Sequence, residues 1–194
     1  RLKIIVIAQD RFSLLGGITT VNRILGRAFE EAGYNVSYLA LYDNMGDNPD
    51  AVTPDFVIRS GSLVSKITHN KLVYNNPGPL NAVLTAKKTF TVLWDRYNAV
   101  RTSRYLRSLG KDTVILTSMT NIAEYLVDYA RKGQKQGIGY LYEFHSAFDS
   151  FHRTASEEVL QEIGRYYDSF ISLSEGDARL FAEWLNRPVE AVHN

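Results

Sequence analysis

The chain of 194 residues contains no cysteine. This absence excludes disulfide bonds, a catalytic thiolate and a zinc site with cysteine ligands. An excess of charge of one sign is also missing, because 22 Lys and Arg side chains are balanced by 21 Asp and Glu side chains, for a formal net charge of +1. The composition therefore gives no reason to expect nucleic-acid or membrane binding driven by bulk charge.

Long hydrophobic runs are missing as well, since no apolar stretch approaches the roughly 20 residues that a membrane-spanning helix needs. The chain begins inside the strand-like run LKIIVIAQ, without Met or a signal-peptide pattern, and ends on a second such run, VEAVHN, which we interpret as a cut end. Hydrophobic residues make up 45% and charged residues 22%. These values and the length are typical of a globular protein with one α/β domain or two small ones.

Strand-like and helix-like runs alternate along the chain. The continuous apolar run at 3–8 is typical of a strand covered on both faces, and apolar residues follow at helical spacing over 18–32. Further strands are predicted at 36–41, 56–59, 113–117, 138–144, 170–173 and 189–192, and further helices at 93–109, 121–131, 156–167 and 175–185. The alternation predicts an α/β fold, a Rossmann-like and mostly parallel sheet with helices on both faces, because parallel strands need long crossovers.

Local details follow from turn and capping residues. We expect Thr19 or Thr20 to cap the start of the helix at 18–32, and Gly33 to follow its end. Residues 60–92 are the least informative part, in which 71–74 is read as a strand and NNPGPLN as a turn. The stretch after the strand at 138–144 is expected to be a loop.

Ligands of parallel sheets bind at the carboxyl ends of the strands, so the joints after the strands are the places to search. Gly16 and Gly17 lie in the first joint, where backbone N–H groups that no side chain screens suit an anion or a hydroxyl-rich ligand. A dinucleotide fingerprint is not formed, because the glycines are adjacent and Gly26 falls within the helix, although Asp43 stands roughly where an acid would bind a ribose. A Walker P-loop fails too. The alternative is a loop whose own turn needs positive φ.

His145 falls at the carboxyl edge of the fifth predicted strand, where a catalytic or ligand-binding residue would sit. The alternative is a hydrogen-bonded structural histidine. His145, Asp149 and His152 would share a face if the segment were helical and would then suit a metal, but we expect a loop there and predict no metal site. The stretch DNMGDNPD superficially suggests a calcium loop, yet its twelfth position is proline instead of glutamate.

Polar side chains also follow the fourth and sixth predicted strands. Ser118, Asn121 and Ser174 are candidates for acceptor binding because of that position. Ser174 and Asp177 also form a capping-box-like helix start, which is a structural role. No Gly-x-Ser-x-Gly elbow is present, so an α/β-hydrolase is disfavoured.

Three arginines, Arg101, Arg104 and Arg107, recur at three-residue steps in VRTSRYLRSLGK. On a helix they would span an arc of roughly 120°. Such a face suits an anionic lipid surface or a phosphorylated acceptor. The alternative is an ordinary solvated helix face.

Three stretches together resemble the N-terminal domain of a family 4 glycosyltransferase, a retaining enzyme with two Rossmann-like domains (the GT-B fold). They are GGITTVNRILGRAFEEAGYNVSYLAL at 16–41, YEFHSAF around His145, and YYDSFISLSEGDARLFAEWLNRPVEAVHN at 166–194. The order and spacing of the stretches carry the likeness, and residues 60–110 carry none of it. The final stretch ends in Val-His-Asn, where the family has a proline before the Asn.

The resemblance implies that residues 1–194 form one Rossmann-like domain, which shapes the acceptor site, and that a C-terminal domain outside this chain supplies most nucleotide-sugar contacts. The complete enzyme would transfer a hexose to a hydroxyl group of a glycan, lipid or wall polymer, in cell-envelope or polysaccharide biosynthesis. The resemblance implies no cofactor and no required metal, with the nucleotide sugar as co-substrate. This chain alone is expected to be inactive.

Site residues carry over by position in the same way. Gly16 and Gly17, with Thr19 beside them, would lie against the donor diphosphate and the transferred sugar. His145 would act at the reaction centre, where it would form a hydrogen bond with a sugar hydroxyl or a backbone carbonyl near the reacting carbon. Ser146 stands where the family often has Asp or Gly.

Two other classes of function stay open at this point. One is a non-catalytic Rossmann-like binding module for a protein or polyanion partner, and the other is an NAD-dependent enzyme. The expected location is the cytoplasm, with peripheral contact at the inner face of an anionic membrane through the three arginines. No nucleic-acid partner is expected.

Overall fold

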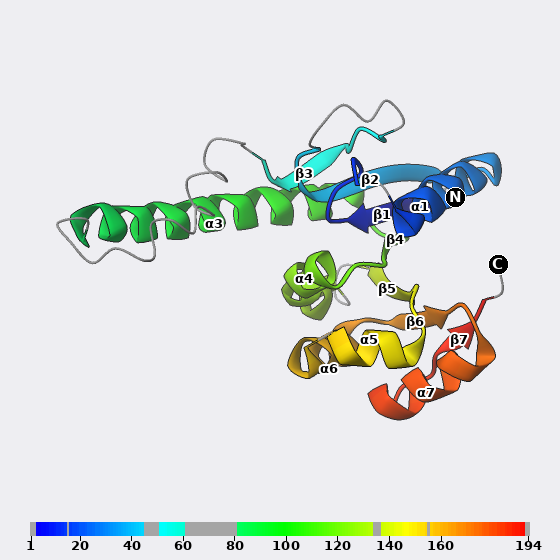
Figure 1. Cartoon of the computed structure of the whole chain (residues 1–194). Coiled ribbons are helices and arrows are strands. Elements are labelled where there is room, and N and C mark those ends of the chain that lie inside the picture. The colour runs from blue at the N-terminus through cyan, green and yellow to red at the C-terminus, as the bar shows by residue number, and fades with distance from the viewer. Residues whose placement is uncertain are drawn as a thin grey trace.

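The computed structural model describes residues 3–14, 16–44, 51–60, 81–133, 137–154 and 156–192. Their strands form one sheet in which every neighbouring pair is parallel, in the order β3-β2-β1-β4-β5-β6-β7 (Figure 1). Six helices connect and cover these strands. The predicted α/β, Rossmann-like class is therefore confirmed.

The strands fall close to the predicted ranges. Their bounds are β1 Ile4–Gln9, β2 Asn35–Tyr42, β3 Phe56–Arg59, β4 Thr113–Thr117, β5 Ile138–Phe144, β6 Ser169–Ser172 and β7 Glu190–Ala191. Strand β1 is central and pairs with β2 on one side and β4 on the other, so that Ile4 lies opposite both Asn35 and Thr113. The continuous apolar runs predicted this arrangement because an inner parallel strand is covered on both faces.

The helices are α1 Gly17–Glu31, α3 Asn81–Leu109, α4 Thr120–Gly133, α5 Phe148–Thr154, α6 Glu157–Tyr166 and α7 Glu175–Leu185. Helix α5 corrects the expectation of a loop after β5. Helix α3 begins earlier than the predicted residue 93 and extends beyond the sheet (Figure 1). The predicted strand at 71–74 and most of the NNPGPLN turn lie outside the described residues.

The ends of α1 differ in part from the sequence expectation. Gly16 is the N-cap and no side chain caps the helix, so the expected threonine cap is wrong. The Thr20 hydroxyl instead donates back to the Gly16 carbonyl at 3.2 Å. At the other end, Gly33 has a φ of 87° and follows the C-cap residue, as predicted.

The two faces of the sheet carry cores of different size. Under α1 lies a small core of Ile5, Ile7, Phe12, Ala40 and Leu116. On the opposite face, residues of α4, α6 and α7 and the last turns of α3 pack on the sheet around a larger core. Helices therefore cover both faces, as the sequence predicts.

Aromatic side chains dominate the larger core. The rings of Phe144 and Phe181 are stacked with centroids 3.8 Å apart, and the ring of Phe151 meets both edge to face. The Tyr142 hydroxyl lies 3.3 Å from the Thr120 hydroxyl. This cluster holds the carboxyl end of β5 against α5 and α7, and so fixes the backbone from which His145 projects.

Candidate functional site

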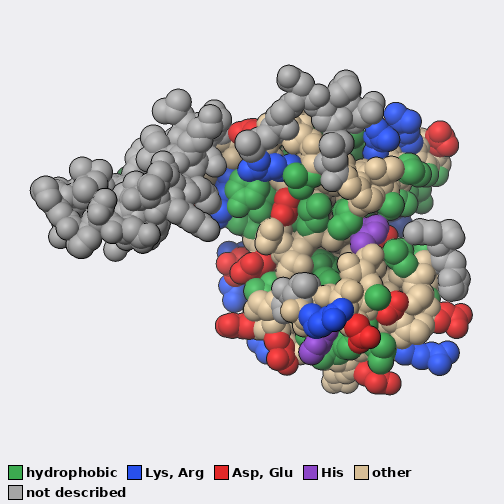
Figure 2. All heavy atoms as spheres, in the orientation of Figure 1, with side chains coloured by type: hydrophobic (Ala, Val, Ile, Leu, Met, Phe, Trp, Pro, Cys, Tyr) green, Lys and Arg blue, Asp and Glu red, His purple; other side chains and the backbone are tan. Residues whose placement is uncertain are grey.

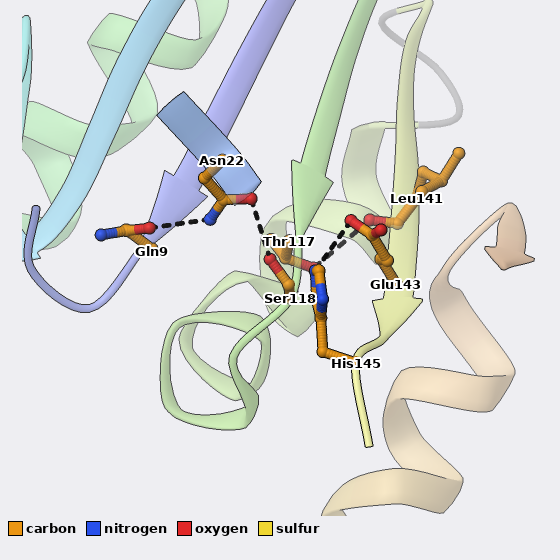
Figure 3. A network of polar contacts seen from close by, with 7 residues as sticks. All are labelled: Gln9, Asn22, Thr117, Ser118, Leu141, Glu143 and His145. Carbon is orange, nitrogen blue, oxygen red and sulfur yellow. Dashed lines mark hydrogen bonds and ion pairs between the residues drawn. The ribbon is translucent and has the colours of Figure 1, made fainter. Parts of the chain in front are cut away.

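The carboxyl ends of β1, β4 and β5 lie side by side because these parallel strands are neighbours in the sheet. Gln9 ends β1, Ser118 directly follows β4, and His145 directly follows β5. The close-up in Figure 3 shows these polar side chains along one edge, together with Asn22 of α1. This edge is where open parallel sheets bind ligands.

Buried amides join α1 to this edge. Gln9 and Asn22 are fully buried, and the Asn22 amide nitrogen donates to Oε1 of Gln9 at 2.7 Å. The Ser118 hydroxyl donates to Oδ1 of Asn22 at 3.3 Å (Figure 3). Gln9 also approaches the hydroxyl of Thr19, with 3.5 Å between Nε2 and Oγ1. The structure thus brings two predicted residues, Thr19 and Ser118, into one network.

Asp10 extends the edge toward α4. Its carboxylate accepts hydrogen bonds from the backbone N–H of Ile122 at 3.2 Å and from the side-chain amide of Asn121 at 2.8 Å. Asp10 therefore caps α4 from the loop after β1. Asn121, which the sequence also predicted as a site residue, is therefore bonded to Asp10, the residue that follows Gln9.

Gly16 and Gly17 form an open joint between β1 and α1. Gly16 is extended, with φ 162° and ψ 167°, and the described glycines with left-handed φ do not include Gly17. A methyl group added at either position would meet no atom within 4 Å. The turn therefore does not need glycine for its own conformation. The pair leaves the backbone N–H groups of the first helical turn open to a ligand.

A buried pair of titratable side chains ends β5. Nε2 of His145 lies 3.1 Å from Oε2 of Glu143, and their side chains are 7% and 6% exposed. Among the described residues neither atom has a partner in hydrogen-bonding geometry. Buried polar atoms are normally satisfied, and exceptions gather at functional sites. The pair therefore places a carboxylate and an imidazole, in contact with each other, directly at the carboxyl edge of the sheet.

The tyrosines near this pair are buried in the core and have a structural role. Burial raises the pKa of Tyr142 to about 12. Burial also raises the pKa of Tyr167, whose hydroxyl donates to the Ala123 carbonyl at 3.2 Å. These phenols stay protonated at neutral pH and are engaged inside the core, so they are unsuited to acid–base chemistry at the edge.

Ser174 is engaged in capping α7. Its hydroxyl accepts from the Asp177 backbone N–H at 3.1 Å and donates to the Asp177 carboxylate at 2.7 Å. The other oxygen of that carboxylate accepts from the Phe148 backbone N–H at 2.8 Å. The hydrogen bond from the Phe148 N–H, and to a smaller extent that from the Ser174 hydroxyl, lower the pKa of Asp177. The capping-box interpretation is confirmed, and Ser174 lies outside the hydrogen bonds that join the rest of the edge.

The three predicted surface arginines have different surroundings. Arg101 donates to the Ser60 hydroxyl at 2.9 Å and lies over the Phe56 ring at 5.0 Å. Arg104 and Arg107 are exposed. Arg101 is therefore turned toward β3, and the surface charge on this part of α3 comes from the other two.

Two of the three residues weighed as metal ligands, His145 and His152, make separate contacts. His145 faces Glu143, whereas the His152 ring stacks on Phe148 with centroids 5.4 Å apart. Within the described ranges, no group of three or more His, Asp or Glu side chains is arranged to hold a metal ion.

Sequence reasoning did not identify Gln9, Asn22 or Glu143 as site residues. Glu143 lies on the same face of β5 as Leu141, and a carboxylate inside a largely apolar strand is a usable signal. Gln9 likewise ends the apolar run of β1. Asn22 gives no comparable signal, because a polar residue in an amphipathic helix is ordinarily solvated.

Comparison of the chain with protein-family models and with curated proteins found no match. Over the part of the chain that the structure covers, no helix combines the length and apolar character needed to cross a membrane. On the face shown in Figure 2, acidic and basic side chains are interspersed.

Proposed function

We propose that this chain is the acceptor-side half of a retaining glycosyltransferase that transfers a hexose from a nucleotide sugar to a hydroxyl acceptor. The observation that carries the proposal is the buried Glu143–His145 pair at the carboxyl end of β5, whose Oε2 and Nε2 atoms lie 3.1 Å apart without a hydrogen-bond partner among the described residues. The open glycine joint at the start of α1 lies at the same edge of the sheet. A second domain would supply most contacts to the donor.

The chemistry of sugar transfer fits these groups. Transfer passes through an oxocarbenium-like state while negative charge develops on the leaving diphosphate. The N-terminus of α1, with Gly16 and Gly17 open to close approach, provides backbone N–H groups and a favourable helix dipole for that charge. Glu143 would orient the imidazole of His145 through Nε2, and the other ring nitrogen would form a hydrogen bond with a hydroxyl of the transferred sugar.

The test uses the full-length gene product and a panel of nucleotide sugars. We expect sugar transfer to fall at least about a hundredfold in His145→Ala and Gly17→Trp, because one loses a contact at the reacting centre and the other blocks the joint. Gly17→Ala and His152→Ala are the matched controls and should keep transfer. Full activity in His145→Ala and Gly17→Trp would remove the site, and absence of transfer from every donor by the unaltered protein would favour the binding-module alternative.

A second role, contact with an anionic membrane, is supported by exposed side chains along one side of α3, the side that near Val100 and Arg107 also borders α4. Val92, Leu93, Tyr97 and Val100 are 65%, 59%, 53% and 52% exposed. Arg104 and Arg107 lie on the same side by helical spacing. An exposed apolar stripe flanked by arginines is the pattern of an interfacial helix.

Vesicles of phosphatidylcholine, with or without phosphatidylglycerol, test this second role. Each basic residue near an anionic surface contributes about 1 kcal/mol, so the double charge reversal Arg104→Glu/Arg107→Glu should weaken binding more than about tenfold. Added salt should also weaken vesicle binding by the unaltered protein. Arg165→Glu, an exposed arginine on α6, is the control. Equal binding by the double variant would leave these arginines as solvated charges.

A further inference from the structure

A groove of about 920 Å³ lies between α3 and α4 and is also lined by Leu41 and Tyr42 of β2 and by Arg59 of β3. These two helices stand at the left and centre of Figure 1. One wall is formed by α3, including Arg96, Val100 and Arg107, and the other wall by α4, including Tyr125 and Tyr129. The volume is at the upper end of the range for small-molecule sites, which indicates a ligand of several rings.

The lining mixes charges of both signs with tyrosine rings. Four cations and three anions line the groove: Arg59, Arg96, Arg107 and Lys132, with Asp95, Glu124 and Asp128. A polyanion would meet the three carboxylates, and an apolar chain would strip water from all seven charges. A ligand with many hydroxyl groups can donate to the carboxylates and accept from the guanidinium groups, so this lining favours a carbohydrate.

Arg59 is fixed at the floor of the groove by its neighbours. Its guanidinium lies 5.6 Å from the centre of the Tyr125 ring and 6.0 Å from that of Tyr42, and Nη1 donates to the Tyr42 hydroxyl at 3.4 Å. Its Nη2 atom lies 3.9 Å from Oδ1 of Asp95, and the side chain stays 32% exposed. A guanidinium held in this way suits a ligand oxygen.

The tyrosines of α4 provide flat apolar surfaces beside these polar groups. The rings of Tyr125 and Tyr129 have centroids 6.0 Å apart and an interplanar angle of 24°. The Tyr129 hydroxyl donates to the Ala99 carbonyl of α3 at 3.2 Å, which holds the ring against the opposite wall. The C–H face of a pyranose ring packs on such an aromatic surface.

One lining residue connects the groove to the carboxyl edge of the sheet. Asn121 lines the groove, and its amide also donates to Asp10, which follows Gln9 at the end of β1. We propose that this groove binds the distal sugar units of an oligosaccharide acceptor, and that Asn121 marks the end nearest the reaction centre. The inference rests on the proposed glycosyltransferase function for the direction of the chain, and on the groove alone for the ligand class.

Binding without donor tests the ligand class. Maltohexaose, cellohexaose and chitohexaose, three hexasaccharides of different linkage or substitution, are titrated calorimetrically into the full-length protein. We expect at least one to bind and Tyr125→Ala to weaken its affinity about tenfold, the loss of one stacked aromatic contact. Glu124→Gln, at an exposed position, should weaken it severalfold without a folding defect, and Tyr34→Ala, outside the groove, should bind like the unaltered protein. Absence of binding by all three sugars, or equal binding by Tyr125→Ala, overturns the proposal.

Transfer assays separate the two proposals. With a nucleotide sugar present, Tyr125→Ala should raise KM for the bound hexasaccharide about tenfold and leave KM for a monosaccharide acceptor unchanged. If both acceptors are used equally well by this variant, the groove proposal fails while the glycosyltransferase proposal stands. If the hexasaccharide binds in the groove but no donor supports transfer, the glycosyltransferase proposal fails while the groove proposal stands.

Discussion

Strand β5 separates two regions that bury different chemistry. Toward α6 and α7 it presents Tyr140, Tyr142 and Phe144, which join a continuous aromatic core. Toward the face that carries α1 it presents Leu141 and then Glu143, whose buried Oε2 has no hydrogen bond among the described residues. The first region holds the strand in place, whereas the second holds a group that stability alone does not explain.

This difference indicates a division between scaffold and site. On the aromatic side, hydroxyl groups such as those of Tyr142 and Tyr167 have partners. On the other side, Glu143 and His145 are desolvated without full compensation, which costs free energy of folding. Natural proteins keep such a cost where function requires it. Substitutions on the two sides should therefore change stability in opposite directions.

The largest effect is expected at the centre of the aromatic side. Phe181 is fully buried and stacks on Phe144, so Phe181→Ala should lower the free energy of unfolding by about 3–5 kcal/mol. Chemical denaturation with an unchanged m-value measures the loss. Leu180→Ala, at an exposed neighbour in the same helix, is the control. A loss below about 1 kcal/mol would contradict the assignment of stability to this side.

Arg187 sharpens the comparison at the rim of the same core. Its guanidinium donates to the carbonyls of Gly164, Tyr167 and Asp168 at 2.9–3.2 Å and lies over the Phe170 ring at 5.5 Å. Charged hydrogen bonds of this kind contribute about 1.5–3 kcal/mol to stability. Arg187→Ala should therefore lower the free energy of unfolding, measured by thermal unfolding, by that amount.

Arg165 provides the matched control for this measurement. It forms an exposed ion pair with Glu162 at 3.2 Å, and such pairs contribute little. We expect Arg165→Ala to change stability by less than about 0.5 kcal/mol. Similar losses of stability in the two variants would show that the hydrogen bonds from Arg187 to the three carbonyls do not stabilise the fold.

The opposite sign is expected at Glu143. Glu143→Leu removes a buried carboxylate whose Oε2 has no hydrogen bond among the described residues, so stability should stay equal or rise by about 1 kcal/mol while sugar transfer by the full-length protein is lost. The melting temperature would then stay or rise by roughly 2–4 °C. A fall of several degrees in the melting temperature would show that Glu143 stabilises the fold, and would contradict the proposed difference between the two sides of β5.

The smallest effect concerns pH and Asp177. Its pKa is lowered in the folded protein by the Phe148 N–H and the Ser174 hydroxyl. The stability it contributes is present above its unfolded pKa of about 3.9 and is lost as pH falls through the lower, folded value. Acid unfolding of Asp177→Asn should therefore begin from a lower neutral-pH stability and show a shallower decline below pH of about 4. Parallel acid transitions would contradict this role.

Sequence periodicity predicted most of the fold because the strands are buried runs and the main helices are amphipathic. The limits of β3, β4, β5 and α7 coincide with the predicted ranges. Helix α5 was missed because seven residues, FDSFHRT, give too short a period, and its Phe148 and Phe151 are ordered by distant core residues. The early start of α3 lies in a stretch without amphipathic pattern.

The site was predictable only in part. Position after a strand identified His145, Ser118, Asn121 and the glycine pair, since chain order alone places them at one edge. Asn22 and Gln9 meet because α1 packs over β1, and the approach of Ser118 depends on β4 pairing with β1. Contacts of this kind depend on strand order and helix packing, which a single sequence does not encode locally.

The central place of β1 also has a consequence for the newly made chain. One edge of β1 can pair with β2 as soon as residues 35–42 are made, but its other edge needs β4, with residues 10–112 in between. At a synthesis rate of about 5–20 residues per second, the interval is roughly 5–20 s. During that time the apolar run IIVIAQ keeps an open hydrogen-bonding edge. Nascent chains paused before residue 113 should therefore depend most on a chaperone at the ribosome.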